Sequence, residues 1–72
     1  MFTAQQDMQF SDFDTRILVV KANGGSITIQ KKVGTSWIIA DTYTADGAFP
    51  MIFGNQPVRF VPVNGCEYEV EQ

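Results

Sequence analysis

Turn signals recur about every ten residues in this chain of 72 residues, so only short segments remain between them. Most contain Asn-Gly, Asp-Gly or Gly-Gly, which accept the positive φ angles of tight turns because glycine has no Cβ and Asn and Asp tolerate the left-handed region. The signals lie at 23–25, 33–35, 45–47, 54–56 and 64–65. This spacing predicts an all-β fold, a small antiparallel β-sandwich or barrel.

The segments between the turns are rich in β-branched and aromatic residues, which suit a pleated and half-buried surface. No window has a convincing helical period. We expect six to seven short strands, at 2–10, 15–22, 26–32, 36–44, 48–53, 57–63 and 66–71. Because the links are short, the last six strands are expected to follow a largely meander order of hairpins, with Asp46 and Gly47 in one hairpin turn.

Side-chain alternation is clearest in the last strand. A period of two places its apolar residues on one face and its glutamates on the other. The apolar set is Cys66, Tyr68 and Val70, and the acidic set is Glu67, Glu69 and Glu71. We interpret Cys66 as a small buried hydrophobe and the glutamates as a charged outer face. A weak calcium site or an acidic docking patch is the alternative for the glutamates.

An apolar run and the prolines indicate which strands lie at the centre of a sheet and which lie at its edges. Residues 17–20 are apolar on both faces, which suits a central strand covered on each side. Proline removes a hydrogen-bond donor from the ladder. Pro50, Pro57 and Pro62 therefore mark the fifth and sixth strands as edges, strand starts or bulges.

The length predicts one β domain over 1–72, since it leaves no room for a second. Within it, the Ser and Asp residues of 11–14 favour a turn that separates the first strand from the rest. Residues 1–14 are therefore expected either to pair within the chain or to form an arm exchanged with a neighbouring subunit.

Composition argues against several classes of function. The net charge is −3, and the five basic residues are scattered. A nucleic-acid partner is not expected, because binding needs a basic stripe that neutralises phosphates. The first residues lack the charged and apolar regions of a signal peptide, and no apolar run approaches the ~18 residues of a membrane span. A membrane partner is therefore not expected either.

The chain has few residues suited to catalysis, since it contains no histidine and only one cysteine. This rules out a Ser-His-Asp triad, a Cys-His pair and an imidazole base. We expect a non-enzyme with no catalytic residue, no cofactor and no metal. A single cysteine also cannot form an internal disulfide, so a domain this small gains from a partner chain.

An apolar cluster suggests where that partner binds. Five apolar residues surround Pro50 in 48–53, more than one half-exposed strand can turn inward, and exposed apolar patches usually mark interfaces. The expected interface residues are Phe49, Met51, Ile52 and Phe53, followed by Phe2, Met8 and Phe10 of the N-terminal segment. Ordinary core or loop packing is the alternative for the cluster. The aromatic residues expected between the sheets are Trp37, Tyr43, Phe60 and Tyr68.

Residues 26–72 resemble a known pattern. Its parts are Ile-Thr-Ile-Gln at 27–30, Gly-Thr-Ser-Trp at 34–37, Asp-Thr-Tyr-Thr-Ala-Asp-Gly at 41–47 and Val-Arg-Phe at 58–60. The pattern is similar to that of small β-sandwich structural and accessory proteins of tailed bacteriophages. In this reading Trp37 is a core anchor, and Arg59 and Phe60 point outward and inward. The chain departs from the pattern at 49–53.

The resemblance implies a virion structural protein, such as a head decoration or cement protein, an adaptor or a tail accessory subunit. Such a protein is made in the host cytoplasm, joins the virion and packs against capsid or tail proteins and copies of itself. The alternative is a small carbohydrate-binding module at a host-contact surface, with Trp37 or Tyr43 as a stacking platform. A small inhibitor of a host enzyme is a third hypothesis, which only the small size and the acidity of the chain support.

Overall fold

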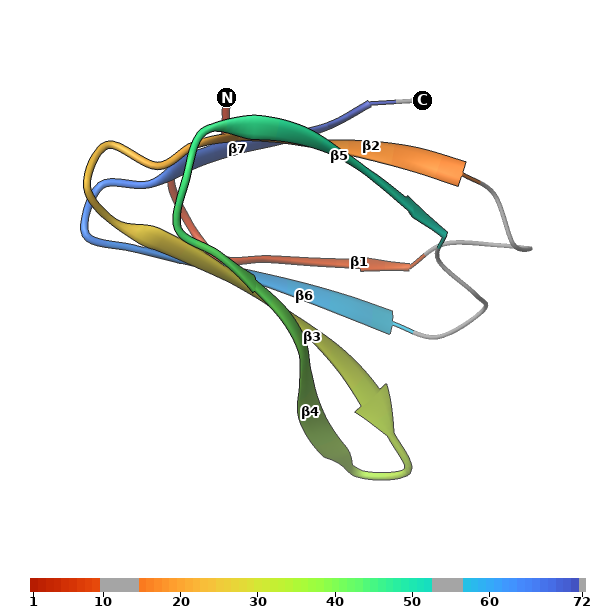
Figure 1. Ribbon diagram of the computed structural model, residues 1–72. Helices are drawn as coiled ribbons and strands as arrows, with labels where there is room; N and C mark the ends of the chain where they lie inside the picture. Colours follow the sequence, from red (N-terminus) through yellow and green to blue (C-terminus); the bar gives the residue numbers. More distant parts are fainter. Residues whose placement is uncertain (10–14, 53–56, 72) are drawn as a thin grey trace.

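The computed structural model describes residues 1–9, 15–52 and 57–71, and these form seven antiparallel strands (Figure 1). The strands are β1 Gln6–Gln9, β2 Thr15–Lys21, β3 Ser26–Val33, β4 Ser36–Tyr43, β5 Gly47–Ile52, β6 Pro57–Val63 and β7 Glu67–Glu71. A four-stranded sheet has the order β1-β6-β3-β4, and a three-stranded sheet has the order β5-β2-β7. The two sheets form a sandwich that does not close into a barrel, which confirms the predicted all-β class.

The expected meander order is wrong. Only β3 and β4 are both successive in the chain and neighbours in a sheet. Each of the other links between successive strands crosses from one sheet to the other. The crossings let both sheets bury one face against each other, which a single meandering sheet of this size cannot do.

The predicted tight turns at 23–25, 33–35 and 64–65 are present, but two of the three are corners and not hairpins. The predicted turn at 54–56 lies outside the described residues. Asn23 and Gly24 have φ angles of 53° and 82°, and Asn64 and Gly65 have 57° and 85°. These two turns join β2 to β3 and β6 to β7, which belong to different sheets. Only the turn at Gly34, with φ 63°, connects neighbouring strands.

The predicted hairpin turn at Asp46 and Gly47 is also wrong. Gly47 begins β5, and the link before it carries the chain from the four-stranded to the three-stranded sheet. The Asp46 carboxylate accepts a hydrogen bond of 2.7 Å from the backbone N–H of Ala22. Asp46 therefore ties this crossing to the end of β2.

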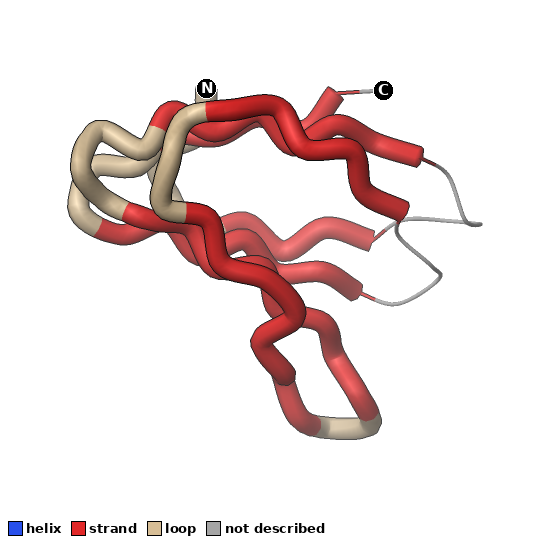
Figure 2. The backbone as a smooth tube through the Cα atoms, in the orientation of Figure 1, coloured by secondary structure: helices blue, strands red, loops and turns tan. Residues whose placement is uncertain are grey.

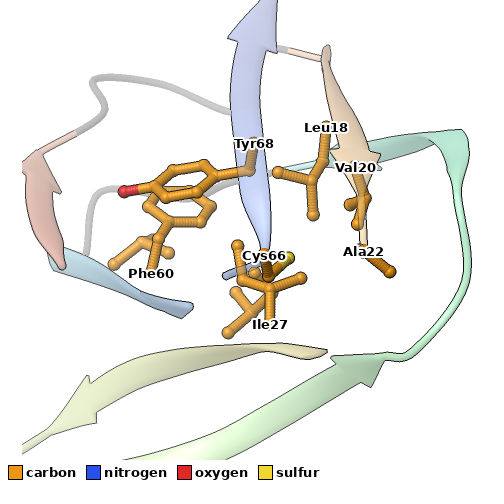
Figure 3. Packing of buried hydrophobic residues seen from close by; sticks show 9 residues of the cluster. Leu18, Val20, Ala22, Ile27, Phe60, Cys66 and Tyr68 are labelled. Atoms are coloured by element: carbon orange, nitrogen blue, oxygen red, sulfur yellow. The ribbon is translucent and has the colours of Figure 1, made fainter. Parts of the chain in front are cut away.

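The core lies between the sheets and is built from β2, β3, β6, β7 and their corners (Figure 3). Its fully buried residues are Leu18, Val20, Ala22, Ile27, Ile29, Val58, Phe60, Cys66 and Tyr68. The rings of Phe60 and Tyr68 stack with centroids 5.4 Å apart. Burial raises the pKa of the Cys66 thiol and raises that of Tyr68 to about 12. The predictions that Cys66, Phe60 and Tyr68 are buried are confirmed.

Trp37 is not the core anchor that the sequence predicts. It lies opposite Lys32, whereas Tyr43 lies opposite the buried Ile27. Directly opposed residues share a face, so Trp37 is on the outer face and Tyr43 on the inner one. A register shift after Ile29 and the reach of the β3–β4 hairpin beyond the sandwich account for this (Figure 2).

The first predicted strand is shorter than expected. β1 pairs with β6 of the same chain, and Phe2 forms a separate bridge to Tyr68 in the other sheet. The N-terminal segment thus contacts both sheets. Residue 10, the last of the predicted strand, and the predicted turn at 11–14 lie outside the described residues.

The central position of β2 and the positions of two of the three prolines agree with the sequence pattern. β2 is the central strand of its sheet, although Ile17 and Val19 on its outer face are only half-buried. Pro50 lies in the edge strand β5, and Pro57 begins β6. The prediction fails for Pro62, which lies inside β6, an inner strand between β1 and β3, and is opposite Ile27 of β3. On its other side Pro62 lies beyond the residues that pair with β1, so its missing N–H breaks no bond between those two strands.

Candidate interaction surfaces

Strand alternation divides the predicted apolar cluster between two faces. Phe49 and Met51 point inward and pack against the core, and the Phe49 ring stacks on Tyr43 with centroids 4.2 Å apart. Ile52 points outward with 62% of its surface exposed. Phe53 lies outside the described residues. Of the predicted cluster, Ile52 is thus the described residue that is free to contact another molecule.

The predicted residues of the N-terminal segment are also separated. Met8 is half-buried and packs against the core. Phe2 remains exposed on one side, and its ring lies 5.6 Å from that of Tyr68. Phe10 lies outside the described residues.

The two faces of β5 are expected to respond differently to substitution. Phe49→Ser removes the stacking on Tyr43 and should lower the free energy of unfolding by about 2 kcal/mol, less than a fully buried phenylalanine loses. Ile52→Ser changes an exposed side chain and should stay within about 0.5 kcal/mol of the wild type. Urea denaturation followed by circular dichroism measures both. Equal losses would contradict the assigned faces.

The outer face of the three-stranded sheet combines apolar and acidic side chains. Opposed residues form the rows Pro50–Ile17–Glu71 and Ala48–Val19–Glu69 across β5, β2 and β7. We call this surface the apolar–acidic face, and it comprises Thr15, Ile17, Val19, Lys21, Ala48, Pro50, Ile52, Glu67, Glu69 and Glu71. The apolar half lies on β5 and β2, and the acidic half lies on β7.

Part of this acidity is compensated within the chain. The Glu67 carboxylate accepts a 2.9 Å hydrogen bond from the side-chain amide of Asn23 and lies 3.9 Å from the Lys21 ammonium. Glu69 lies 3.9 Å from the amino group of Met1. Glu71 forms no ion pair with any described residue. Over the same ranges, no group of three or more acidic or cysteine side chains is placed to hold a metal ion.

A second apolar surface lies on the β3–β4 hairpin, which extends past the edge of the sandwich (Figure 2). Val33 and Ile38 are each 52% exposed, and Ile39 is 63% exposed. Ile38 lies opposite Lys31, so these two and Val33 share one face of the hairpin. We call these three residues the hairpin face.

Sequence reasoning missed this hairpin as a candidate surface. Residues 37–40 are four consecutive apolar residues in one strand, and such a run cannot all point to one face. The run at 37–40 therefore indicates exposed apolar side chains in the same way as the cluster at 48–53. The expectation that Trp37 packs in the core hides the exposure of Ile38 and Ile39 beside it.

The outer face of the four-stranded sheet carries a polar cluster. Arg59 donates two hydrogen bonds to the Asp7 carboxylate, at 2.9 and 3.1 Å, and its guanidinium lies 4.0 Å from the centre of the Trp37 ring. These bonds favour the charged carboxylate and hold the pKa of Asp7 below its usual value. Arg59 points outward and Phe60 inward, as predicted.

The Asp7–Arg59 pair predicts an acid-dependent loss of stability. Because the folded-state pKa of Asp7 is lowered, the pair stabilises the fold above the unfolded-state pKa of the carboxyl, and this contribution disappears as the pH falls through the folded-state value. Asp7→Asn should therefore lower the melting temperature slightly at neutral pH, and the difference should vanish in strong acid. Melting curves across the acidic range measure it, and a constant difference would contradict the prediction.

Comparison with known proteins does not assign the chain to a family. Over the described residues, no helix is long and apolar enough to cross a membrane. Comparison with known protein families, curated proteins and solved structures finds no match.

Proposed function

We propose that the chain is a non-enzymatic structural subunit of a tailed-phage particle that acts by packing against capsid or tail proteins. The observation that carries the proposal is the set of branched apolar side chains left more than half exposed on a very small sandwich. They are Val33, Ile38, Ile39 and Ile52. The sequence resemblance to phage β-sandwich proteins names the kind of particle.

The energetics favour coverage of these side chains by another chain. Burying one fully exposed side chain of this kind contributes about 1.5–3 kcal/mol, and roughly half of that remains to be gained here because each side chain is already partly buried. Four of them offset a sizeable part of the entropy lost on association, which is estimated at about 4–15 kcal/mol. A structural subunit held in place by many neighbours needs only modest affinity at each contact.

Analysis of purified particles tests the proposal. Particles produced from the genome that encodes this chain are separated on a density gradient, and the chain is quantified by mass spectrometry against the major capsid and tail proteins. We expect a fixed stoichiometric ratio that persists after repeated purification. A chain that is abundant in the lysate but absent from the particles would overturn the proposal.

Carbohydrate binding is the second candidate, because Trp37 is only half-buried and lies on an outer face beside Arg59 and Lys32. Arg59 covers part of the ring, and Tyr43 lies on the other face of the sheet, so the two aromatic residues do not form one platform. Trp37 is the single tryptophan, so its fluorescence reports binding directly. A saturable shift on titration with glycans would support this candidate, and an unresponsive Trp37 would count against it.

A further inference from the structure

We propose that the free edge of β4 pairs with β4 of a second copy, so that the four-stranded sheets of two chains join into one continuous sheet in a symmetric dimer. This pairing deepens the proposed function and rests on it, because it names a second copy of the chain as one of the packing partners. It leaves the apolar–acidic face free for capsid or tail proteins.

Three of the four edge strands among the described residues carry features that discourage pairing with another strand. β5 contains Pro50, and β1 is only four residues long. β7 carries three glutamates, and its backbone already exchanges two hydrogen bonds with Phe2 at Tyr68. Proline, short length and charge are means by which proteins protect the edges of sheets.

The fourth edge strand, β4, is the least protected. It spans eight residues without proline, and Asp41 is its one charged residue. Six of the eight residues are exposed, Ile38 and Ile39 among them. The register shift against β3 leaves Ala40 unpaired as a bulge. A bulge also protects an edge, but this one leaves the segment 36–39 regular and open to pairing.

The turn of the hairpin fixes which backbone groups of β4 point outward. Val33 and Ser36 flank a two-residue turn and form the pair next to it. Such a pair exchanges its backbone hydrogen bonds, and the pairs that follow along an antiparallel ladder alternate between bonded and non-bonded. Trp37 and Ile39 therefore belong to non-bonded pairs, so their N–H and C=O groups point away from β3.

These outward groups select one register for two copies of β4. An antiparallel pairing centred on Ile38 places Trp37 of each copy opposite Ile39 of the other. Both residues have outward N–H and C=O groups, so each of the two pairs exchanges both of its N–H···O bonds. A pairing centred on Trp37 or on Ile39 would use only one such pair.

The same register matches the side chains on both faces of the sheet. A twofold axis perpendicular to the sheet keeps each face continuous, so Ile38 of the hairpin face lies opposite Ile38 of the other copy. On the outer face, the Trp37 ring lies beside Ile39 of the other copy. Pairs of aromatic and β-branched side chains stabilise neighbouring strands. A second copy supplies this match by symmetry, which identifies it as the occupant of the edge.

The charges near the pairing do not oppose it. Lys31 lies across from Ile38 on β3. The two Lys31 backbones of the dimer are therefore three strand spacings apart, about 14 Å. This exceeds the Debye length of ~8 Å at physiological salt. Asp41 lies three residues from the axis, so the two copies of Asp41 are about 20 Å apart. The dimer should accordingly depend little on salt.

Substitutions on the edge test the pairing. Ile39→Pro removes an N–H that points away from β3, so it keeps the ladder between β3 and β4 and deletes one donor from each intermolecular pair. Ile38→Ser removes the contact at the axis. The matched control is Val63→Ser, which also replaces an exposed branched side chain, but on β6. Circular dichroism confirms that each variant is folded, and sedimentation equilibrium reports the state of assembly.

We expect the wild type and Val63→Ser to form a dimer and no larger oligomer. Ile39→Pro and Ile38→Ser should each raise the apparent Kd at least tenfold. The fluorescence of Trp37, the single tryptophan, should shift to the blue as the wild type dimerises, because its ring gains a neighbour.

Cross-linking tests the register itself. Opposed residues of a non-bonded antiparallel pair have Cα atoms about 4.5 Å apart, which a disulfide can bridge. Ile38→Cys should therefore form a disulfide between two copies when diamide accepts the two hydrogen atoms of the thiols. The matched control is Ser36→Cys, which is exposed on the same face. Its two positions lie four residues apart along the ladder, about 13 Å. The native Cys66 is buried in both variants.

We expect Ile38→Cys to cross-link at least tenfold faster than Ser36→Cys at equal concentration. A wild type that stays monomeric, a dimer that Ile39→Pro and Ile38→Ser both leave intact, or equal cross-linking of the two cysteine variants would overturn the inference. If Ile39→Pro does not fold, Ile38→Ser and the cross-links decide. A monomer found in purified particles overturns only the inference, and a dimer absent from them overturns only the proposed function.

Discussion

Replacing Tyr68 with alanine is expected to cost the protein most of its stability. The Tyr68 side chain is fully buried, stacks on Phe60 at 5.4 Å and packs against Phe2 at 5.6 Å. Its hydroxyl donates a 3.0 Å hydrogen bond to the carbonyl of Ala4. Truncating a buried aromatic side chain costs about 3–5 kcal/mol. The whole stability of a domain this small is of the same order, at about 0.05–0.15 kcal/mol per residue.

Urea denaturation followed by circular dichroism measures the loss. The matched control is Tyr68→Phe, which keeps the ring and loses only the hydrogen bond to Ala4, at a cost of about 1 kcal/mol. We expect the alanine variant to be largely unfolded and the phenylalanine variant to fold. If both lost the same small amount, the central place of this ring in the core would be refuted.

Replacing Gly25 with alanine is expected to disrupt the corner between β2 and β3. An added Cβ would lie 2.1 Å from the carbonyl oxygen of Val63 and 2.7 Å from that of Asn64. These are backbone atoms of the neighbouring corner, which the Asn23 side chain also contacts through a 3.0 Å hydrogen bond to the Gly65 carbonyl. One corner must therefore move, and we expect a loss of about 3 kcal/mol or more.

Gly34→Ala is the matched control for Gly25→Ala. At Gly34 an added Cβ meets nothing within 4 Å, but φ is +63°, a conformation that costs alanine about 1–2 kcal/mol. Thermal and urea denaturation of both variants give the comparison. A loss at Gly25 no larger than the loss at Gly34 would contradict the close contact of the two corners.

The strands could be predicted because their signals are local. The alternation of Cys66, Tyr68 and Val70 with three glutamates correctly separated the two faces of β7. The placement of β2 at the centre of a sheet followed from its apolar run. In each case, the residues of one strand carry the information.

The candidate surfaces could be predicted only in part. The cluster at 48–53 lies largely in strand β5, where alternation sends Phe49 into the core and leaves Ile52 outside. Trp37 was expected inside, because a large aromatic residue after a turn usually packs in a core. Its place depends on the register of β3 against β4 and on how far the other sheet extends, and neither is local.

The sequence by itself determined where the chain turns, which segments are strands and which side chains of a strand share a face. These follow from the φ angles that Asn and Gly accept and from the two-residue period of a strand. The tertiary structure decided which sheet each strand joins. It made corners of the turns at Asn23 and Asn64 and left one face of the β3–β4 hairpin uncovered. The reason is physical: a turn sets only the local direction of the chain, whereas burial of a face requires the whole opposing sheet.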